Sequence, residues 1–390
     1  MTAINQNERI ASLDVIRGFA LIGILIANVY AMTSLGFFKL SYGIPVADET
    51  QLDSTIRLLI NLFVDGSFVS TFSFLFGVGF YIFMTRAAQK GLPEKRLFLR
   101  RMAGLAVFGL LHLIFFWVGD ILFTYALSGI FLLFFLRVKA KTALIWAIGL
   151  LTLFFLILAS SALTPEAFLT PMQAQGMQLI SQAQAAYANG ISVEWFRFRL
   201  ENEVSMVVSG APFLIPYTLG LFLLGFYAAK KEIFVDLASK RTLFKRLAII
   251  GYITAIPFMV LLLLAHPASL ETANGMFLYD VILRIGALPL ALGYMATLVL
   301  IVSAGKLKGL TARLGAMGRI ALTNYLMHTV LIVLFVQLTG FFGQISMAQN
   351  MLIVAVIIAL QLWLSPLYLS KYRYGPMEYI WRRITYGKLS

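Results

Sequence analysis

The sequence predicts an all-α, polytopic helical membrane protein with about ten transmembrane helices and with both termini in the cytoplasm. Three observations predict it. The composition is 60% hydrophobic and 12% charged, whereas soluble domains carry about 25% charged residues. Apolar runs of about 20 residues, the length that crosses the hydrocarbon core, recur along nearly the whole chain. Basic residues gather in every second connection between these runs, as the positive-inside rule requires.

The apolar runs organise residues 1–390 as a single transmembrane domain. Each run is close to the length that a helix needs to span a bilayer. The ten expected spans lie near residues 14–33, 68–86, 101–118, 120–136, 143–162, 206–228, 247–265, 276–304, 316–338 and 348–370.

Lysine and arginine are concentrated in the even-numbered connections and in the tail, residues 371–390. The odd connections contain only Lys39, Arg57, Arg197 and Arg199. We therefore expect a protein of the bacterial cytoplasmic (inner) membrane whose even connections and tail are cytoplasmic and whose main partner is the lipid bilayer. This placement accounts for most of the net charge of +14, so no nucleic-acid partner is expected. The chain has no cysteine, which excludes disulfides and thiolate chemistry.

Two connecting segments are expected to be helical without crossing the membrane. The longest connection, residues 163–205, has a helix start at Thr164-Pro165-Glu166. Its Gln/Ala-rich part is typical of an amphipathic helix on the extracytoplasmic face. Residues 56–67 are expected to form a second interfacial helix that leads into the second span. For both segments, a structural cap without a ligand role is the alternative interpretation.

Three polar side chains from three spans are predicted to lie at similar depth. With a rise of about 1.5 Å per residue, Asn28 lies about 20 Å from the cytoplasmic side, His112 about 17 Å and His328 about 18 Å. Polar groups at this depth are costly unless paired and often mark functional sites. For either histidine alone, packing with a hydrogen bond to the next helix is the alternative. Asn324, one turn before His328, fits a role in interhelical hydrogen bonding equally well.

Charged residues border this polar layer. Asp120 is expected at the outer end of the tight turn WVGDIL. Asp280 precedes Arg284 by four residues, so the two side chains share a helix face and are expected to pair. At the cytoplasmic edge Asp14 and Arg17, three residues apart, are expected to face one another or a neighbouring helix. Three scattered histidines without carboxylates at ligand spacing do not indicate a metal site, and none is expected.

Five segments resemble the YeiB family of bacterial inner-membrane proteins. They are LDVIRGFALIGILIAN, FSFLFGVGF, GLLHLIFFWVGDILFTYALSG, GRIALTNYLMHT and YGPMEYIWRRITYG, in family order across nearly the whole chain. The first also resembles the opening helix of the transmembrane acyltransferase superfamily, which includes heparan-alpha-glucosaminide N-acetyltransferase. In that enzyme the asparagine that matches Asn28 lies at the acetyl-CoA site. His112 is the histidine that matches a YeiB-family motif, whereas the family pattern has glutamine at the position of His328.

The superfamily resemblance implies transfer of an acyl group from cytoplasmic acyl-CoA, a cosubstrate, to a small-molecule or lipid-linked acceptor on the extracytoplasmic side. It implies that His112 is the general base and that Asp120 orients it. Asn28 and Asn324 would polarise the thioester, and Asp14 and Arg17 would hold the inner gate. The residues expected to bind substrate or cosubstrate are Asp14, Arg17, Asn28, Arg284, Asn324 and His328.

Two other classes of function fit the same residues. In a transporter of small solutes or lipid-linked compounds, the polar layer would be the substrate site, and Asp280 and Arg284 would be gating charges. In a membrane scaffold or sensor, the same residues would serve without turnover. The sequence also leaves the oligomeric state open, a homodimer included.

Overall fold

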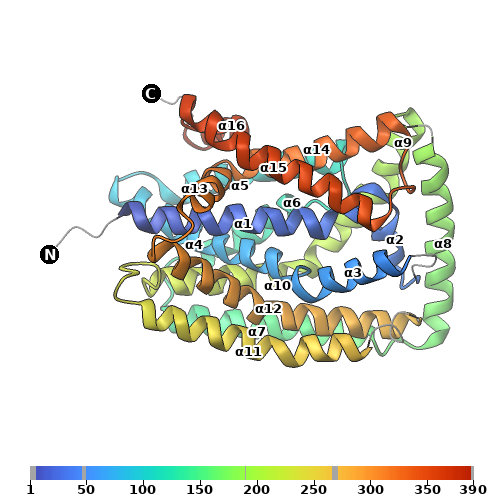
Figure 1. Ribbon diagram of the computed structural model, residues 1–390, viewed down its shortest axis with the longest axis horizontal. Helices are drawn as coiled ribbons and strands as arrows, with labels where there is room; N and C mark the ends of the chain where they lie inside the picture. The colour runs from blue at the N-terminus through green and yellow to red at the C-terminus, as the bar shows by residue number, and fades with distance from the viewer. Residues whose placement is uncertain (1–5, 46–49, 189, 266–270, 388–390) are drawn as a thin grey trace.

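The computed structural model describes residues 6–45, 50–188, 190–265 and 271–387. Within these residues the fold is all-helical, and the long helices run side by side along one axis (Figure 1). The helices are α1 (Gln6–Thr33), α2 (Gly36–Ser41), α3 (Gln51–Phe63), α4 (Ser67–Gln89), α5 (Glu94–Phe115), α6 (Leu122–Phe131), the 3-10 helix η1 (Leu132–Phe135), α7 (Ala140–Ser161), α8 (Glu166–Ala188), α9 (Val193–Phe198), the π-helix η2 (Arg199–Val204), α10 (Ser205–Lys230), α11 (Arg241–Ala265), α12 (Ala273–Ser303), α13 (Lys308–Arg319), α14 (Ala321–Thr339), α15 (Met347–Lys371) and α16 (Pro376–Tyr386).

The protein is a multi-pass helical membrane protein. Nine helical stretches of the described residues are long and apolar enough to cross a membrane. The predicted span 120–136 is shorter than expected, because α6 and η1 together cover only Leu122–Phe135, about 21 Å against a hydrocarbon core of about 30 Å. The turn before α6 is drawn into the protein, where Asp120 is 5% exposed. The nine stretches are Ala11–Thr33, Gln51–Gln89, Glu94–Phe115, Ala140–Ser161, Val193–Lys230, Arg241–Ala265, Ala273–Ser303, Ala321–Thr339 and Met347–Lys371.

Two consecutive helices, α3 and α4, occupy the region before and within the second predicted span. α3 and α4 form one apolar stretch, Gln51–Gln89, and Figure 1 shows both helices along the bundle axis. The structure confirms a separate helix that leads into the second span, because α3 ends at Phe63 and α4 begins at Ser67; its interfacial position stays a prediction. The break between α3 and α4 lies at Gly66, whose φ is +74° and where a Cβ would lie 2.8 Å from the Cβ of Ala287. Glycine meets both constraints because it has no Cβ.

The crossing predicted at residues 316–338 is also interrupted. Its membrane helix, α14, has no side-chain cap from its own N-cap residue, Ile320. Glu378 of α16 supplies the cap instead, because its carboxylate accepts the backbone N–H groups of Leu322 at 2.7 Å and Thr323 at 3.1 Å. A carboxylate at a helix N-terminus satisfies free N–H groups and complements the helix dipole. Burial raises the pKa of the Glu378 carboxyl.

Both ends of the described chain lie at the same end of the bundle, and α8 lies across the opposite end (Figure 1). The connections rich in lysine and arginine lie with the termini, and we call this the basic end. α8 occupies most of residues 163–205. Its buried residues recur at helical spacing on one face, as an amphipathic helix requires; they are Leu169, Gly176, Ile180, Ala183 and Ala186.

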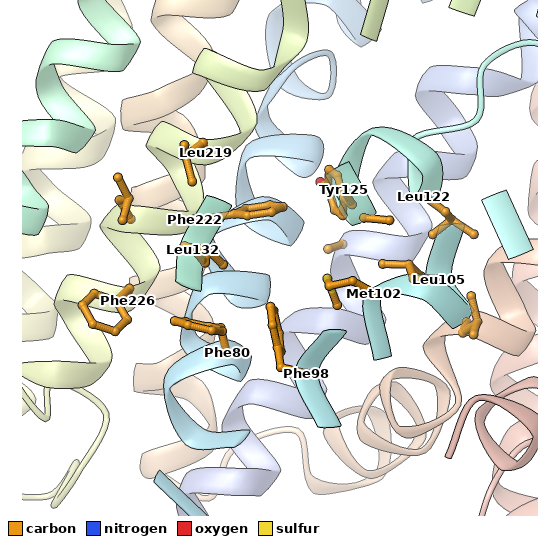
Figure 2. Close-up of a cluster of buried hydrophobic side chains, with 14 of the residues drawn as sticks. Phe80, Phe98, Met102, Leu105, Leu122, Tyr125, Leu132, Leu219, Phe222 and Phe226 are labelled. Atoms are coloured by element: carbon orange, nitrogen blue, oxygen red, sulfur yellow. The ribbon is translucent and has the colours of Figure 1, made fainter. Parts of the chain in front are cut away.

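Glycines allow the helices to approach at backbone distance. A Cβ at Gly18 would lie 2.0 Å from the carbonyl oxygen of Leu314, and one at Gly77 would lie 1.8 Å from that of Phe222. Around the second contact, an aromatic-rich cluster from α4, α5, α6, η1 and α10 fills the interior (Figure 2). The ring of Phe76 stacks on that of Phe222 with centroids 4.4 Å apart. Any side chain at Gly77 would force α4 and α10 apart.

Cysteine labelling tests the predicted orientation. The chain has no cysteine, so single substitutions give no background. Ala185 on α8 and Ser239 between α10 and α11 are both exposed. We expect a membrane-impermeant maleimide to modify Ala185→Cys from the outside of cells and Ser239→Cys only from the cytoplasmic side. Labelling from the reversed sides would show that the basic end faces outwards.

Candidate functional site

A cavity of about 610 Å³ runs through the bundle, and we call it the central cavity. One face of α1 lines it with Arg17, Ile24, Asn28 and Ala31. Arg17 lies nearest the basic end, and Asn28 lies about 16 Å farther along the helix. Most of the remaining wall is apolar; α4 contributes the largest share, and α5, α6, α10, α12 and α14 contribute further residues. Asn28 is therefore an amide at mid-depth on the wall of a largely apolar cavity, where a polar ligand group would find a strong hydrogen-bond partner.

His112 and Asp120 form a buried pair next to this cavity. His112 is 2% exposed and Asp120 5% exposed, and Nδ1 of His112 lies 2.7 Å from Oδ2 of Asp120. The other carboxylate oxygen of Asp120 accepts the backbone N–H of Phe123 at 2.9 Å, which holds the acid at the start of α6. The turn therefore folds Asp120 back onto His112, as the sequence predicted.

The second ring nitrogen of His112, Nε2, is buried and makes no hydrogen bond with the described residues. The hydroxyl of Tyr325 likewise has no hydrogen-bond partner among them. The rings of His112 and Tyr325 lie 5.4 Å apart between centroids, and Tyr325 lines the central cavity. His112 itself is not among the lining residues. Of the polar side chains predicted at similar depth, Asn28 thus lines the cavity directly, whereas His112 lies behind Tyr325.

Asn324 and His328 lie in the contact between α14 and α15 and do not line the central cavity. Nε2 of His328 lies 2.6 Å from Oε1 of Gln361, whose amide donates to the carbonyl oxygen of Asn324 at 3.1 Å. Nδ2 of Asn324 donates to the carbonyl oxygen of Met317 at 3.0 Å. The expectation that they bind substrate finds no support in this geometry, because neither side chain lines the cavity and the hydrogen bonds that they make join helices. Nδ1 of His328 has no hydrogen-bond partner among the described residues.

A second cavity, of about 560 Å³, opens at the basic end, and we call it the basic vestibule. Five cationic side chains line it and only one carboxylate, that of Asp14. This carboxylate is paired with Arg17, as predicted, at 2.7 Å. The excess of positive charge suits phosphate groups, which arginine binds through charge-assisted hydrogen bonds. The charged residues of the vestibule are Asp14, Arg17, Arg86, Lys90, Arg101 and Arg382.

The basic vestibule and the central cavity are adjacent, and we call the region between them the throat; four residues line both cavities, namely Arg17, Gly79, Phe83 and Arg101. The guanidinium of Arg101 lies 3.6 Å from the centre of the Trp381 ring. Trp381 Nε1 in turn donates to the carbonyl oxygen of Arg101 at 2.7 Å. Helix α16 therefore fixes one side of the throat, a role that the sequence did not reveal.

The half of the central cavity farther from the basic end carries three charged groups. Arg284 pairs with Asp280, as predicted, at 2.7 Å between Nε and Oδ2. Both line the cavity together with Asp65, from the turn between α3 and α4. Asp65 was missed because an acidic residue before glycine is typical of a solvated turn.

Arg199, Glu203 and Tyr187 form a buried cluster at the far end of the bundle. Arg199 is 1% exposed and lies 2.6 Å from Glu203, whose other oxygen accepts the Tyr187 hydroxyl at 2.6 Å. The guanidinium also donates to the carbonyl oxygen of Leu113 at 2.6 Å, one residue beyond His112. The sequence interpretation counted Arg199 as a loop charge, whereas it holds the end of α5 that carries the histidine.

These features define a class of protein: a multi-pass helical membrane protein with a cavity that leads from a basic mouth to buried polar groups. The family described as "Protein of unknown function (DUF418)" matches residues 228–388. The uncharacterized protein YxaH of Bacillus subtilis (strain 168) is 30% identical over 97% of this chain and 95% of its own. The chain belongs to this YeiB-like DUF418 family.

Two further relatives are similar over nearly their full length. An uncharacterized 39.9 kDa protein encoded in the amylase 3' region of Bacillus acidopullulyticus is 28% identical over 100% of this chain and 97% of its own. The uncharacterized protein YeiB of Escherichia coli (strain K12) is 25% identical over 97% of this chain and 96% of its own. No solved structure matches this chain.

Proposed function

We propose that this protein is a membrane acyltransferase of the bacterial inner membrane, which moves an acyl group from cytoplasmic acyl-CoA to a small-molecule or lipid-linked acceptor on the other side. One observation carries the proposal: the basic vestibule lies next to a largely apolar cavity that reaches Asn28, and four residues line both. The phosphates of acyl-CoA would bind in the vestibule. The uncharged pantetheine arm would pass the throat, and the thioester would lie near Asn28.

The chemistry would use His112 as the base. Its Nε2 takes the proton of the acceptor hydroxyl or amine while the acceptor oxygen or nitrogen attacks the thioester carbonyl carbon. The amide of Asn28 donates a hydrogen bond to the oxyanion of the tetrahedral intermediate. The carbon–sulfur bond then breaks, and the imidazolium returns the proton to the thiolate of CoA. Asp120 holds the ring through Nδ1 and stabilises the imidazolium, and the Tyr325 ring must turn aside for Nε2 to reach the cavity.

The other charged groups of the cavity would serve the acceptor. Asp280, Arg284 and Asp65 lie in the half of the central cavity that faces away from the vestibule. Arg284 uses Nε for Asp280, which leaves its two terminal nitrogens for hydroxyl or phosphate oxygens of an acceptor. Asn324 and His328 have no part in this mechanism.

A transporter is the second candidate, and a specific observation favours it. The central cavity extends from Arg17 and Arg101 near the basic end to Phe37 and Leu40 on α2 at the far end. A solute that follows this path would meet Asp280 and Arg284 as charged groups of a gate. A transporter of an anionic solute would take up that solute in vesicles and would show no acyl transfer.

Acyl-CoA is expected to bind with a Kd in the micromolar range, about −8 kcal/mol. Isothermal titration calorimetry of the purified protein in detergent measures it. The double substitution Arg86→Gln/Lys90→Gln should raise the Kd on the order of tenfold or more, because charge-assisted hydrogen bonds to phosphate are lost. Higher salt should weaken binding to the unchanged protein.

Lys245→Gln/Arg246→Gln is the matched control for this titration. Both residues are exposed at the basic end and neither lines the vestibule, so their loss removes the same two charges away from the site. Equal weakening by both variants would indicate a diffuse effect of charge rather than a site. A folded protein that binds no acyl-CoA of any chain length would contradict the proposed function.

A further inference from the structure

Two glycines of α4, Gly77 and Gly79, have opposite surroundings although they are two residues apart. A Cβ at Gly77 would lie 1.8 Å from the carbonyl oxygen of Phe222, so Gly77 is needed for packing against α10. The nearest described atom to a Cβ at Gly79 would be a guanidinium nitrogen of Arg17, at 3.9 Å. Helix packing therefore does not require glycine at position 79. Alanine would fit there and would stabilise the helix relative to glycine, so the glycine needs another explanation.

The space beside Gly79 is the throat itself. Gly79 lines both the basic vestibule and the central cavity, as do Arg17, Phe83 and Arg101. Phe83 lies one turn after Gly79 on the same helix face, and the two arginines bring positive charge to the same level. A side chain at position 79 would project into the space between the two cavities, where the guanidinium of Arg17 is the described group nearest to an added Cβ.

The charges at the throat determine which part of a ligand passes. Arg17 and Arg101 attract phosphate groups, whereas the central cavity beyond them is largely apolar. Moving a phosphate past them would take it away from the cations of the vestibule and along largely apolar walls toward Asn28, and a buried charge is stable only when paired. An anionic head group therefore stays in the vestibule, and a thin uncharged arm enters the central cavity.

We propose that Gly79 determines the width of this passage and so decides which ligands reach Asn28 from the basic end. The ligand class is a phosphate-bearing molecule with a narrow, uncharged arm. Its identity as acyl-CoA rests on the proposed function, whereas the passage rests on the geometry of the two cavities alone. Gly79 is a specificity-determining residue in this view and takes no part in chemistry.

Cysteine accessibility tests the passage without any knowledge of the reaction. Ala27 lines the central cavity beyond the throat. Ala27→Cys places a thiol there, and the cysteine side chain is only slightly larger than that of alanine. A small methanethiosulfonate reagent is applied to the basic side of sealed, inside-out vesicles. With Gly79 unchanged, the thiol should be modified. Gly79→Ala should slow the modification several-fold, and Gly79→Leu should slow it on the order of 100-fold.

Gly149→Leu, in α7, is the matched control. Gly149 is exposed and has no described atom within 4 Å of an added Cβ, so the same side chain is added away from the throat. Lys90→Cys in the vestibule should react equally with either residue at position 79, which shows that the folded mouth is intact. Unchanged modification of Ala27→Cys in the folded Gly79→Leu variant would overturn the proposal, and so would an unreactive thiol with Gly79 in place.

Binding measurements show whether a negative result refutes the passage at Gly79 or the proposed acyl transfer. CoA, which has the phosphates and the arm but no acyl group, is compared with long-chain acyl-CoA by calorimetry. Gly79→Leu should leave the binding of adenosine 3',5'-diphosphate unchanged and should raise the Kd of acyl-CoA at least tenfold. If neither CoA nor acyl-CoA binds but the labelling depends on position 79, the passage stands and its ligand is not acyl-CoA. If acyl-CoA binds equally with leucine at position 79, the passage is refuted and acyl transfer is not.

Discussion

Replacing His112 by alanine is expected to lower acyl transfer by a factor on the order of 10² to 10⁴, the usual contribution of a general base. The imidazole is the group that would accept the acceptor's proton, and its Nδ1 is already held by Asp120 at 2.7 Å. Binding of acyl-CoA should persist, because His112 is not among the residues that line either cavity. Transfer of a radiolabelled acyl group in reconstituted vesicles measures the rate, and calorimetry measures the binding.

Two further variants show whether a loss of acyl transfer in His112→Ala is specific to the proposed site. His328→Gln is the matched histidine control: His328 bonds to Gln361 between α14 and α15 and does not line the central cavity, so little change in transfer is expected. Asn28→Ala should lower the rate on the order of 10²-fold through loss of an oxyanion contact. Normal transfer in both His112→Ala and Asn28→Ala would exclude the proposed site. Collapse of activity in His328→Gln alone would move the base to α14.

Arg199→Ala is expected to destabilise the folded protein by about 3–5 kcal/mol, the usual effect of removing one partner of a buried ion pair. Arg199 is 1% exposed, and Glu203 is fully buried. The substitution leaves the Glu203 carboxylate without its cation and the carbonyl oxygen of Leu113 without its donor at 2.6 Å. Denaturant unfolding in detergent, followed by circular dichroism, measures the change.

Arg197→Ala is the control for this prediction, because Arg197 lies two residues away in the same segment between α8 and α10 but is exposed. Exposed substitutions of this kind usually change stability by no more than about 0.5 kcal/mol. Arg199→Met combined with Glu203→Leu should recover part of the loss, since an apolar pair of similar volume leaves no buried charge. Similar unfolding curves for the two single arginine variants would show that the Arg199 pair contributes nothing to the fold.

Local spacing explains which parts of the site could be predicted. Asp14 and Arg17 are three residues apart and Asp280 and Arg284 four apart, and both pairs form as expected. Helix geometry alone brings such residues to one face. The contact of His112 with Asp120 was foreseeable for a related reason, since a short turn joins their helices. No comparable rule connects Arg199 with Leu113, because 86 residues separate them along the chain.

The predicted depth of a residue in the membrane did not show whether its side chain lines the cavity. Asn28 and His328 were expected at similar depth, yet Asn28 lines the central cavity and His328 bonds to Gln361 of α15. Depth follows from the rise per residue, whereas the direction of a side chain depends on how the helix is rotated in the bundle. In a membrane helix that is apolar on nearly every side, no hydrophobic stripe reveals this rotation.

The sequence by itself determined that this protein is a helical membrane protein, where most of its spans lie and which ends of the helices carry the basic residues, because these depend on length, hydrophobicity and charge along the chain. Which residues contact one another follows from the way the helices pack. Packing places Gly77 against the backbone of α10 and Gly79 beside the throat, although the two are only two residues apart. It also brings Arg86 and Lys90 of the α4–α5 region beside Arg382 of α16 around one vestibule. The physical reason is that cavities are what remains between packed helices, and packing joins residues that no sequence period connects.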